Sequence, residues 1–279
     1  MRRRLIAAVV VAGIALALAA GAYVVLRSRY EGQLRIAARP GITLSRGGAS
    51  LARGAYLFGG AARCASCHGA DAGGAYVLHD ALLGILWGPN LTRGNASTPD
   101  DPSVGQRYSD ADFERAIRRG VRPNGQRLLA MPSWDYARMS DADVASLVAY
   151  LRAVPPVARP AAEFRLGPLG RLDVVDGALA FDADRIGDAP PHALSSRGEA
   201  VAREAGCMRC HAAAGAPPAL PTQHRGPLLA SLRDAGSARF AAVPEHASLR
   251  LNDDDVRALR AFLSASAAAR RERTAARST

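Results

Sequence analysis

The feature that most constrains this chain is a five-residue pattern, Cys-x-x-Cys-His, that occurs twice. The first copy runs from Cys64 to His68 and the second from Cys207 to His211. Together they use all four cysteines of a chain of 279 residues with only six histidines, so a chance origin for both is negligible. In both copies a histidine directly follows the second cysteine, so an explanation of the pattern must give a role to three side chains rather than two.

Covalent haem attachment gives all three side chains a role. Two cysteines three positions apart lie on one helical turn and can form thioethers with the two vinyl groups of a porphyrin, while the adjacent histidine places a ring nitrogen under the iron. The sequence therefore predicts two covalently bound haem c groups. The attachment residues are Cys64, Cys67 and His68 for the first haem and Cys207, Cys210 and His211 for the second.

Other roles for paired cysteines fit this pattern less well. A four-cysteine zinc site places its pairs about 15–20 residues apart, whereas more than a hundred residues separate His68 from Cys207. A thioredoxin-like pair needs a strand–helix context, and none is predicted before either motif. Disulfides between the pairs are compatible with the spacing, but they leave both histidines unexplained.

The N-terminal segment predicts export and membrane anchoring. Arg2, Arg3 and Arg4 precede an uncharged apolar run over residues 5–26. At about 1.5 Å per residue this run spans roughly 30 Å, the thickness of a bilayer core. A cleaved signal usually has a shorter apolar region, and the apolar run continues past the small residues at 20–22 that could be a cleavage site. We therefore favour an uncleaved anchor over a cleaved signal.

The anchor also predicts the location of the protein. Basic residues before a span stay in the cytoplasm, so we expect a single pass through the cytoplasmic membrane, residues 5–26 in lipid, and haem domains in the periplasm. The net charge of +11 comes from dispersed arginines that are not interleaved with aromatic residues. We therefore expect no nucleic-acid binding.

The sequences around the two motifs form an internal repeat. Each motif follows a lead-in with apolar residues at helical spacing, precedes a Gly-Pro segment, and belongs to a unit that ends in a helix. Matching segments are 53–57 and 197–201, 88–91 and 226–229, and the closing helices 141–151 and 253–263. Ser140 and Asn252 are the predicted helix caps. His79 and His192 have no counterpart in the repeat, and we expect them at the surface or in a linker.

The first repeat contains a candidate for the second axial ligand of its iron. Cytochrome c domains usually place a methionine opposite the histidine. Met131 precedes Pro132 in a loop before the closing helix, and Pro132 fixes the backbone there. Met139 lies next to the helix cap, where a core position is expected. We predict Met131 as the ligand.

The second repeat departs from this pattern. Val243 stands where the first repeat has Met131, and no methionine follows His211. His246 could ligate the second iron, or Val243 could leave that iron open to a small ligand, and the sequence favours these two equally. His224 is a more distant third candidate.

From about Arg53 to Pro156 the chain resembles the class I cytochrome c domains of multihaem subunits in membrane-bound bacterial dehydrogenases, such as the alcohol and gluconate dehydrogenases. The segments that carry the resemblance are 64–68 (CASCH), 88–92 (GPNLT), 108–113 (YSDADF), 118–121 (RRGV), 131–132 (MP) and 140–143 (SDAD). From residue 197 onward the resemblance is weaker. The resemblance over the first unit implies a mostly helical fold and a role in electron transfer.

We therefore expect a mostly α-helical chain with two tandem cytochrome c-type domains, the second divergent, after an N-terminal transmembrane helix. The expected parts are the anchor at 1–30, the first domain at 48–156, a Pro/Gly-rich linker at 157–194, the second domain at 195–264 and a basic tail at 265–279. Weak apolar alternation in the linker predicts a hairpin around Asp176-Gly177.

The expected function is one-electron transfer without catalysis. Two haems on an anchored chain would relay electrons between a membrane donor, such as a dehydrogenase or a quinol-oxidising complex, and a redox acceptor. A dihaem peroxidase or a gas sensor would instead need an open second haem. The second repeat offers only Glu245 and His246 for acid–base chemistry there, which favours the electron carrier.

Overall fold

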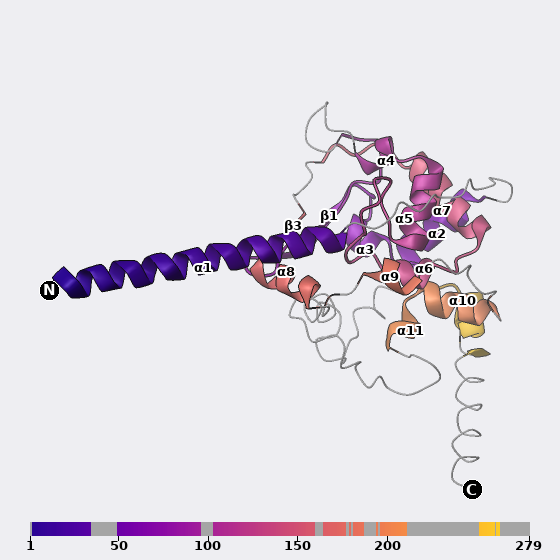
Figure 1. Cartoon of the computed structure of the whole chain (residues 1–279). Helices are drawn as coiled ribbons and strands as arrows, with labels where there is room; N and C mark the ends of the chain where they lie inside the picture. The colour runs from indigo at the N-terminus through magenta and orange to yellow at the C-terminus, as the bar shows by residue number, and fades with distance from the viewer. Residues whose placement is uncertain are drawn as a thin grey trace, which may run out of the picture.

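The computed structural model describes residues 2–34, 49–95, 103–159, 164–176, 179, 181–186, 194, 196–210, 251–259 and 261–262. These residues are mostly helical, as the sequence predicts. Helix α1 (Arg2–Leu34) projects from the body of the protein as a long rod (Figure 1). Residues 2–28 of this helix are long and apolar enough to cross a membrane, and that window is not buried by the rest of the protein.

The body contains short helices and one small antiparallel sheet in the order β1-β2-β3. The helical elements are α2 (Leu51–Tyr56), the π-helical turn η1 (Leu57–Ala61), α3 (Ala65–His68), α4 (Val104–Arg107), α5 (Asp110–Arg119), α6 (Ser133–Tyr136), α7 (Asp141–Ala153), α8 (Pro168–Val175), α9 (Asp182–Ile186), α10 (Arg197–Glu204) and α11 (Cys207–Cys210). The strands are β1 (Ala75–Asp80), β2 (Gly84–Gly88) and β3 (Arg165–Leu166). Residues 253–259 form a further helix.

Side-chain caps determine where the main helices begin. Ser109 and Asp112 form a reciprocal capping box at the start of α5, which satisfies backbone groups that the helix cannot pair itself. The Ser140 side chain accepts the Asp143 N–H at the start of α7, and the Asn252 side chain accepts the Asp255 N–H at 2.8 Å. Both predicted caps are confirmed.

The first core forms where α2 and η1 pack across α7. Gly54 permits this close crossing, because a Cβ atom at that position would lie 2.1 Å from the Ser146 carbonyl oxygen and 2.6 Å from the Tyr150 Cβ. The fully buried side chains around the crossing include Leu57, Phe58, Val144, Leu147, Val148 and Leu151. Removing this apolar area from water stabilises the fold by roughly 25 cal/mol per Å².

The second core lies between the sheet and the segment after α7. Gly84 has a positive φ of 119°, and a Cβ there would lie 2.1 Å from the Arg165 carbonyl oxygen, so glycine lets β3 approach β2. The buried residues of this core are Leu83, Leu86, Leu166, Val174, Leu179 and Phe181. Part of the Pro/Gly-rich segment therefore packs on the first domain.

The predicted hairpin around Asp176-Gly177 is wrong. Leu172 to Val175 lie in α8 rather than in a strand. Pro168 at the first turn has the backbone angle that a helix start requires, and Val174 is buried in the second core. The apolar spacing of this short segment fits one face of a helix as well as a strand, so the pattern alone did not separate the two.

The helix before the second motif packs as its counterpart does. A Cβ atom on Gly198 in α10 would lie 2.2 Å from the Ala258 carbonyl oxygen and 2.6 Å from the Phe262 Cβ. Gly198 matches Gly54 in the repeat, and residues 258 and 262 match 146 and 150. The two helix crossings therefore share the same register.

The crossing at Gly54 is testable by stability measurements. We expect Gly54→Ala to lower the free energy of unfolding by about 1–3 kcal/mol, because the added methyl group overlaps the backbone of α7. The measurement is a denaturant titration of the haem-loaded protein in detergent. Gly59→Ala is the matched control, since a Cβ there meets nothing within 4 Å. Equal stability of the two variants would contradict the close crossing.

Candidate haem-binding site

The first motif forms a single helical turn. The backbone N–H groups of Cys67 and His68 both donate to the Cys64 carbonyl oxygen, at 3.2 Å and 3.0 Å. This turn brings two thiols and an imidazole onto one short element, as covalent attachment of a porphyrin requires. Both thiols are free in the structure. Burial raises the pKa of the Cys64 thiol to about 12.

His68 is held in a defined orientation by the segment after β2. Its Nδ1 atom lies 2.9 Å from the Pro89 carbonyl oxygen, and a carbonyl only accepts, so Nδ1 carries the proton. The Nε2 atom is then the nitrogen available to a metal. His68 is buried, and this burial lowers its pKa and favours the neutral ring that a metal ligand needs.

Gly88 allows the Pro89 segment to approach the motif. A Cβ atom on Gly88 would lie 1.8 Å from the Cys67 carbonyl oxygen. The next residues tie this segment to the end of the domain, because the Asn90 side chain accepts the Thr92 N–H at 2.9 Å and donates to the Val157 carbonyl at 2.7 Å. The Gly-Pro-Asn-Leu-Thr sequence thus holds the carbonyl partner of His68 in place.

Trp87 carries a polar group that a bound porphyrin could satisfy. Its indole Nε1 is buried without a hydrogen-bond partner among the described residues, and it immediately precedes the Gly88-Pro89 segment. An unpaired buried donor is unfavourable by about 1–3 kcal/mol. A carboxylate of a bound porphyrin would accept a hydrogen bond from this donor, so Trp87 and the first motif fit a bound haem c.

The two candidate methionines occupy different environments. Met139 is 3% exposed within the first core, so its predicted core role is confirmed. Met131 is only partly buried and packs against the edge of that core. Met131 therefore stays available as an axial ligand, and its ligation remains a prediction.

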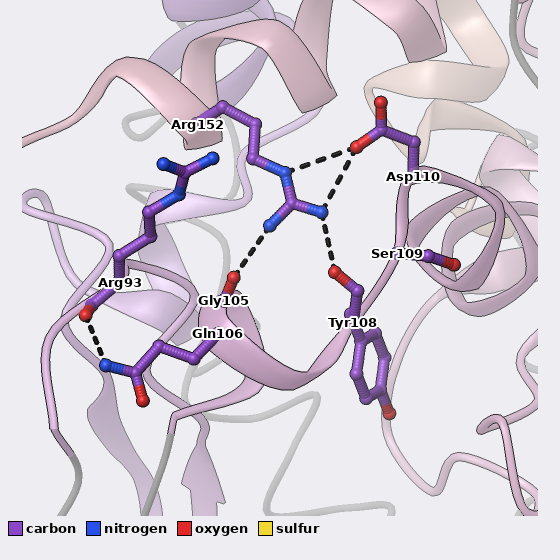
Figure 2. Close-up of a pocket in the computed structure, with 7 residues that line it drawn as sticks. All are labelled: Arg93, Gly105, Gln106, Tyr108, Ser109, Asp110 and Arg152. Atoms are coloured by element: carbon purple, nitrogen blue, oxygen red, sulfur yellow. Dashed lines mark hydrogen bonds and ion pairs between the residues drawn. The ribbon is translucent and has the colours of Figure 1, made fainter.

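A surface pocket lies at the junction of α4, α5 and α7, and Figure 2 shows the residues that line it. The Arg152 guanidinium donates to the carbonyl oxygens of Gly105 at 2.7 Å and Tyr108 at 2.6 Å, and it pairs with Asp110 at 3.1 Å. Because these bonds link α7 to the chain around α4 and α5, Arg152 has a structural role. The sequence analysis did not identify this residue.

The second motif is described as far as residue 210, where α11 ends. Cys207 is partly buried. The predicted ligands His211 and His246, together with Val243 and His224, lie outside the described residues. A Cβ on Gly206 would lie 2.6 Å from the Arg63 guanidinium, so the residues directly before the two motifs are neighbours.

A cluster of charged residues joins the two repeats. The Arg53 Nε atom lies 2.7 Å from Asp143, and the Arg197 Nε atom lies 2.8 Å from Asp255, which is the matching pair of the second repeat. The pairs also cross, with Arg53 3.8 Å from Asp255 and Arg197 3.9 Å from Asp143. Tyr56 donates to Asp255 at 2.6 Å. The four charges therefore form one network across the contact.

Glu204 is the buried acid of this cluster. It is 3% exposed, three residues before Cys207, and its Oε2 atom lies 3.9 Å from Arg53. Burial, reinforced by the charge of Asp143, raises its pKa to about 7. Glu204 is thus a carboxyl that takes up a proton close to neutral pH.

These features fit the predicted haem c site. Residues 49–151 match the family described as "Cytochrome C oxidase, cbb3-type, subunit III", and they form a cytochrome c domain, whose family implies covalently bound haem c. The segment includes the first motif, Trp87, the Gly88-Pro89 segment and Met131. The expected resemblance to cytochrome c subunits of dehydrogenases is confirmed for this domain.

Several curated relatives are similar over this part of the chain. The cytochrome c subunit of a quinone-dependent alcohol dehydrogenase from Gluconacetobacter polyoxogenes is 35% identical over 103 residues, which cover 35% of this chain and 20% of the relative. The gluconate 2-dehydrogenase cytochrome c subunit of Pantoea cypripedii is 37% identical over 116 residues, or 40% and 25%. The fructose dehydrogenase cytochrome subunit of Gluconobacter japonicus is 35% identical over 124 residues, or 42% and 24%. The matched region thus spans a quarter or less of each relative.

Replacement of Trp87 tests its place in the site. We expect Trp87→Phe to lower the midpoint potential of the first haem by tens of millivolts, because loss of a donor to a porphyrin carboxylate disfavours the reduced iron, and ~1 kcal/mol corresponds to about 40 mV for one electron. The measurement is a spectroscopic redox titration. Trp134→Phe is the control, since Trp134 stacks against Arg185. Unchanged potentials in both variants would contradict this role.

Replacement of Glu204 tests the buried acid. Its folded-state pKa of about 7 exceeds the ordinary value of 4.5. Between these two pH values the folded state binds a proton that the unfolded state has released, so the free energy of unfolding of the wild type falls as the pH rises. Between pH 4.5 and pH 7 we expect this group to lower the free energy of unfolding of the wild type by roughly 3 kcal/mol, and we expect Glu204→Gln not to show this decrease. Urea titrations at both pH values provide the measurement. Exposed Asp254→Asn should follow wild type, and equal pH profiles for wild type and Glu204→Gln would contradict the assignment.

Proposed function

We propose that this chain is a membrane-anchored dihaem cytochrome c that transfers single electrons between a membrane donor and a redox acceptor. The observation that carries this proposal is the repeated geometry before the two motifs, with Gly54 on α7 matched by Gly198 on the helix of residues 253–259. In this function the chain is an electron carrier and catalyses no reaction of its own. When bound, each haem supplies a one-electron iron couple.

The residues of this chain would hold the first haem through two side chains. Pro89 would keep the His68 Nε2 atom available to the metal, and Met131 would supply a thioether ligand. A thioether ligand raises the iron potential relative to a second histidine. With both of these ligands bound, the site would change little between oxidation states, which would favour rapid electron transfer.

A second cytochrome c domain at residues 195–264 is supported by matched contacts. Arg197 pairs with Asp255 as Arg53 pairs with Asp143, and Asn252 caps its helix as Ser140 does. We assign Cys207, Cys210 and His211 to the second haem by the motif. Its sixth position is taken by His246 or left open at Val243.

The contact between the repeats supports a relay along the chain. Arg63 lies against Gly206, and each of these residues directly precedes an attachment cysteine. The two haems would therefore be bound through neighbouring segments, and a short separation favours direct electron exchange. The charged network of Arg53, Asp143 and the matching pair would hold this arrangement.

The partner that fits this relay is a dehydrogenase or a quinol-oxidising complex. The relatives are named as cytochrome subunits of alcohol, gluconate and fructose dehydrogenases. We assign α1 as a single-pass anchor in the cytoplasmic membrane with residues 5–26 in lipid and the haem domains in the periplasm. We assign no nucleic-acid partner.

Haem counting and low-temperature electron paramagnetic resonance test this function. We expect two haems per chain in the oxidised protein, with a low-spin first haem that becomes high-spin in Met131→Ala, because the variant loses a strong-field axial ligand. Met139→Leu is the control, since Met139 belongs to the core, and it should retain the wild-type spectrum.

The second haem has its own test on the same samples. Replacing Cys207 and Cys210 together by serine should reduce the count by one haem, because no thioether can form there. A low-spin second signal in wild type indicates a histidine ligand, which we assign to His246 ahead of His224, and a high-spin signal indicates an open site. A count of one haem in wild type would overturn the dihaem proposal.

A further inference from the structure

The base of α1 makes a lateral contact with the body of the protein. Helix α8 packs along α1 (Figure 1). The Arg171 Nη1 atom lies 3.1 Å from the Tyr23 hydroxyl oxygen, and the Arg171 guanidinium lies over the Tyr23 ring at 5.7 Å from its centroid. Part of the body is therefore fixed at the level of Tyr23.

The position of Tyr23 sets the height of this contact in a bilayer. The rise from Leu5 to Tyr23 is about 27 Å at 1.5 Å per residue, close to the ~30 Å thickness of a hydrocarbon core. Tyrosine is favoured at the boundary between lipid and water. If α1 spans the membrane, as proposed above, Tyr23 and Arg171 lie at its outer boundary.

Three exposed leucines lie beside this contact. Leu82 is 58% exposed in the turn between β1 and β2, and Leu169 and Leu172 in α8 are 37% and 47% exposed. The Leu169 N–H donates to the Leu82 carbonyl at 3.2 Å, and Leu172 follows Leu169 by one helical turn. The three side chains thus belong to one apolar edge next to the anchor.

Basic residues accompany the leucines. A groove of about 490 Å³ between α1 and the sheet is lined in part by Tyr23, Arg165 and Arg171. The carboxylate of Asp80 in this groove already accepts the N–H groups of Leu82 and Leu83. Within the described part of the chain, no carboxylate lies within ion-pair distance of Arg165 or Arg171, so the groove offers positive charge to a ligand.

We propose that Leu82, Leu169 and Leu172 form a membrane-docking surface that enters the boundary of the bilayer, with Arg165 and Arg171 binding the phosphate groups of anionic lipids. Leucines with neighbouring basic residues are the combination that binds an anionic lipid surface. The surface is continuous with the anchor, which identifies the bilayer as its occupant. This proposal rests on the assignment of α1 as a membrane span.

Thiol accessibility tests the docking surface. The haem-loaded chain carrying Leu172→Cys is placed in nanodiscs of phosphatidylcholine mixed with phosphatidylglycerol and treated with a water-soluble maleimide. Leu51→Cys is the matched control, because Leu51 is 55% exposed on α2, and each rate is normalised to that of the same variant in dodecyl sulfate. We expect position 172 to react about tenfold more slowly than position 51, since lipid excludes the reagent and disfavours the thiolate.

The basic residues are tested in the same assay. Replacing Arg165 and Arg171 by glutamine in the Leu172→Cys chain should raise its reaction rate, and nanodiscs of phosphatidylcholine alone should have the same effect. Equal rates at positions 172 and 51 in the mixed nanodiscs would overturn the docking surface and leave the leucines free for a protein subunit. Extraction of the chain from membranes by alkaline carbonate would instead overturn the assignment of α1 as a membrane span.

Discussion

The crossing of α2 on α7 is the contact on which the first domain depends. It joins the segment before the first motif to the helix that ends the domain, and it is possible because Gly54 brings no side chain between the two backbones. The turn from Cys64 to His68 follows directly from α2 and η1, so the crossing also positions the attachment residues. The approach of Gly88 to Cys67 then places Pro89 against His68. Two glycines thus allow the close approaches around which the polar contacts of the site are built.

The same arrangement explains how two repeats can meet. Each lead-in helix carries an arginine beside its glycine, and each arginine pairs with an aspartate on its own closing helix. Where the two pairs come together, each arginine lies near the aspartates of both repeats. These attractions offset the unfavourable free energy of removing the charges from water. Within the described part of the chain, Glu204 forms its ion pair with Arg53 at 3.9 Å. Burial, reinforced by the charge of Asp143, outweighs this pairing and raises the pKa of Glu204 above that of an ordinary carboxyl group.

Much of the fold of the first domain could be predicted from the sequence, because its signals are local. The helix caps at Ser140 and Asn252, the apolar helix at the N-terminus and the core position of Met139 follow from short-range patterns. The sheet and α8 did not, since segments such as 172–175 fit a strand or a helix equally and their choice depends on burial against Leu83 and Leu166. The role of Arg152 depends on carbonyl groups brought near by folding. The ligands of both haems stay predictions.

The contact between Tyr23 and Arg171 has a consequence for how the protein meets its partners. If α1 spans a membrane, a body joined to it by the chain alone could tilt and turn relative to that helix, whereas a second contact at the level of Tyr23 fixes the body against it. A partner diffusing in the same bilayer would then meet the cytochrome domain at a constant height and tilt at every encounter. The search for a productive complex would become two-dimensional and largely oriented in advance, and a modest contact area would suffice for a brief exchange of electrons.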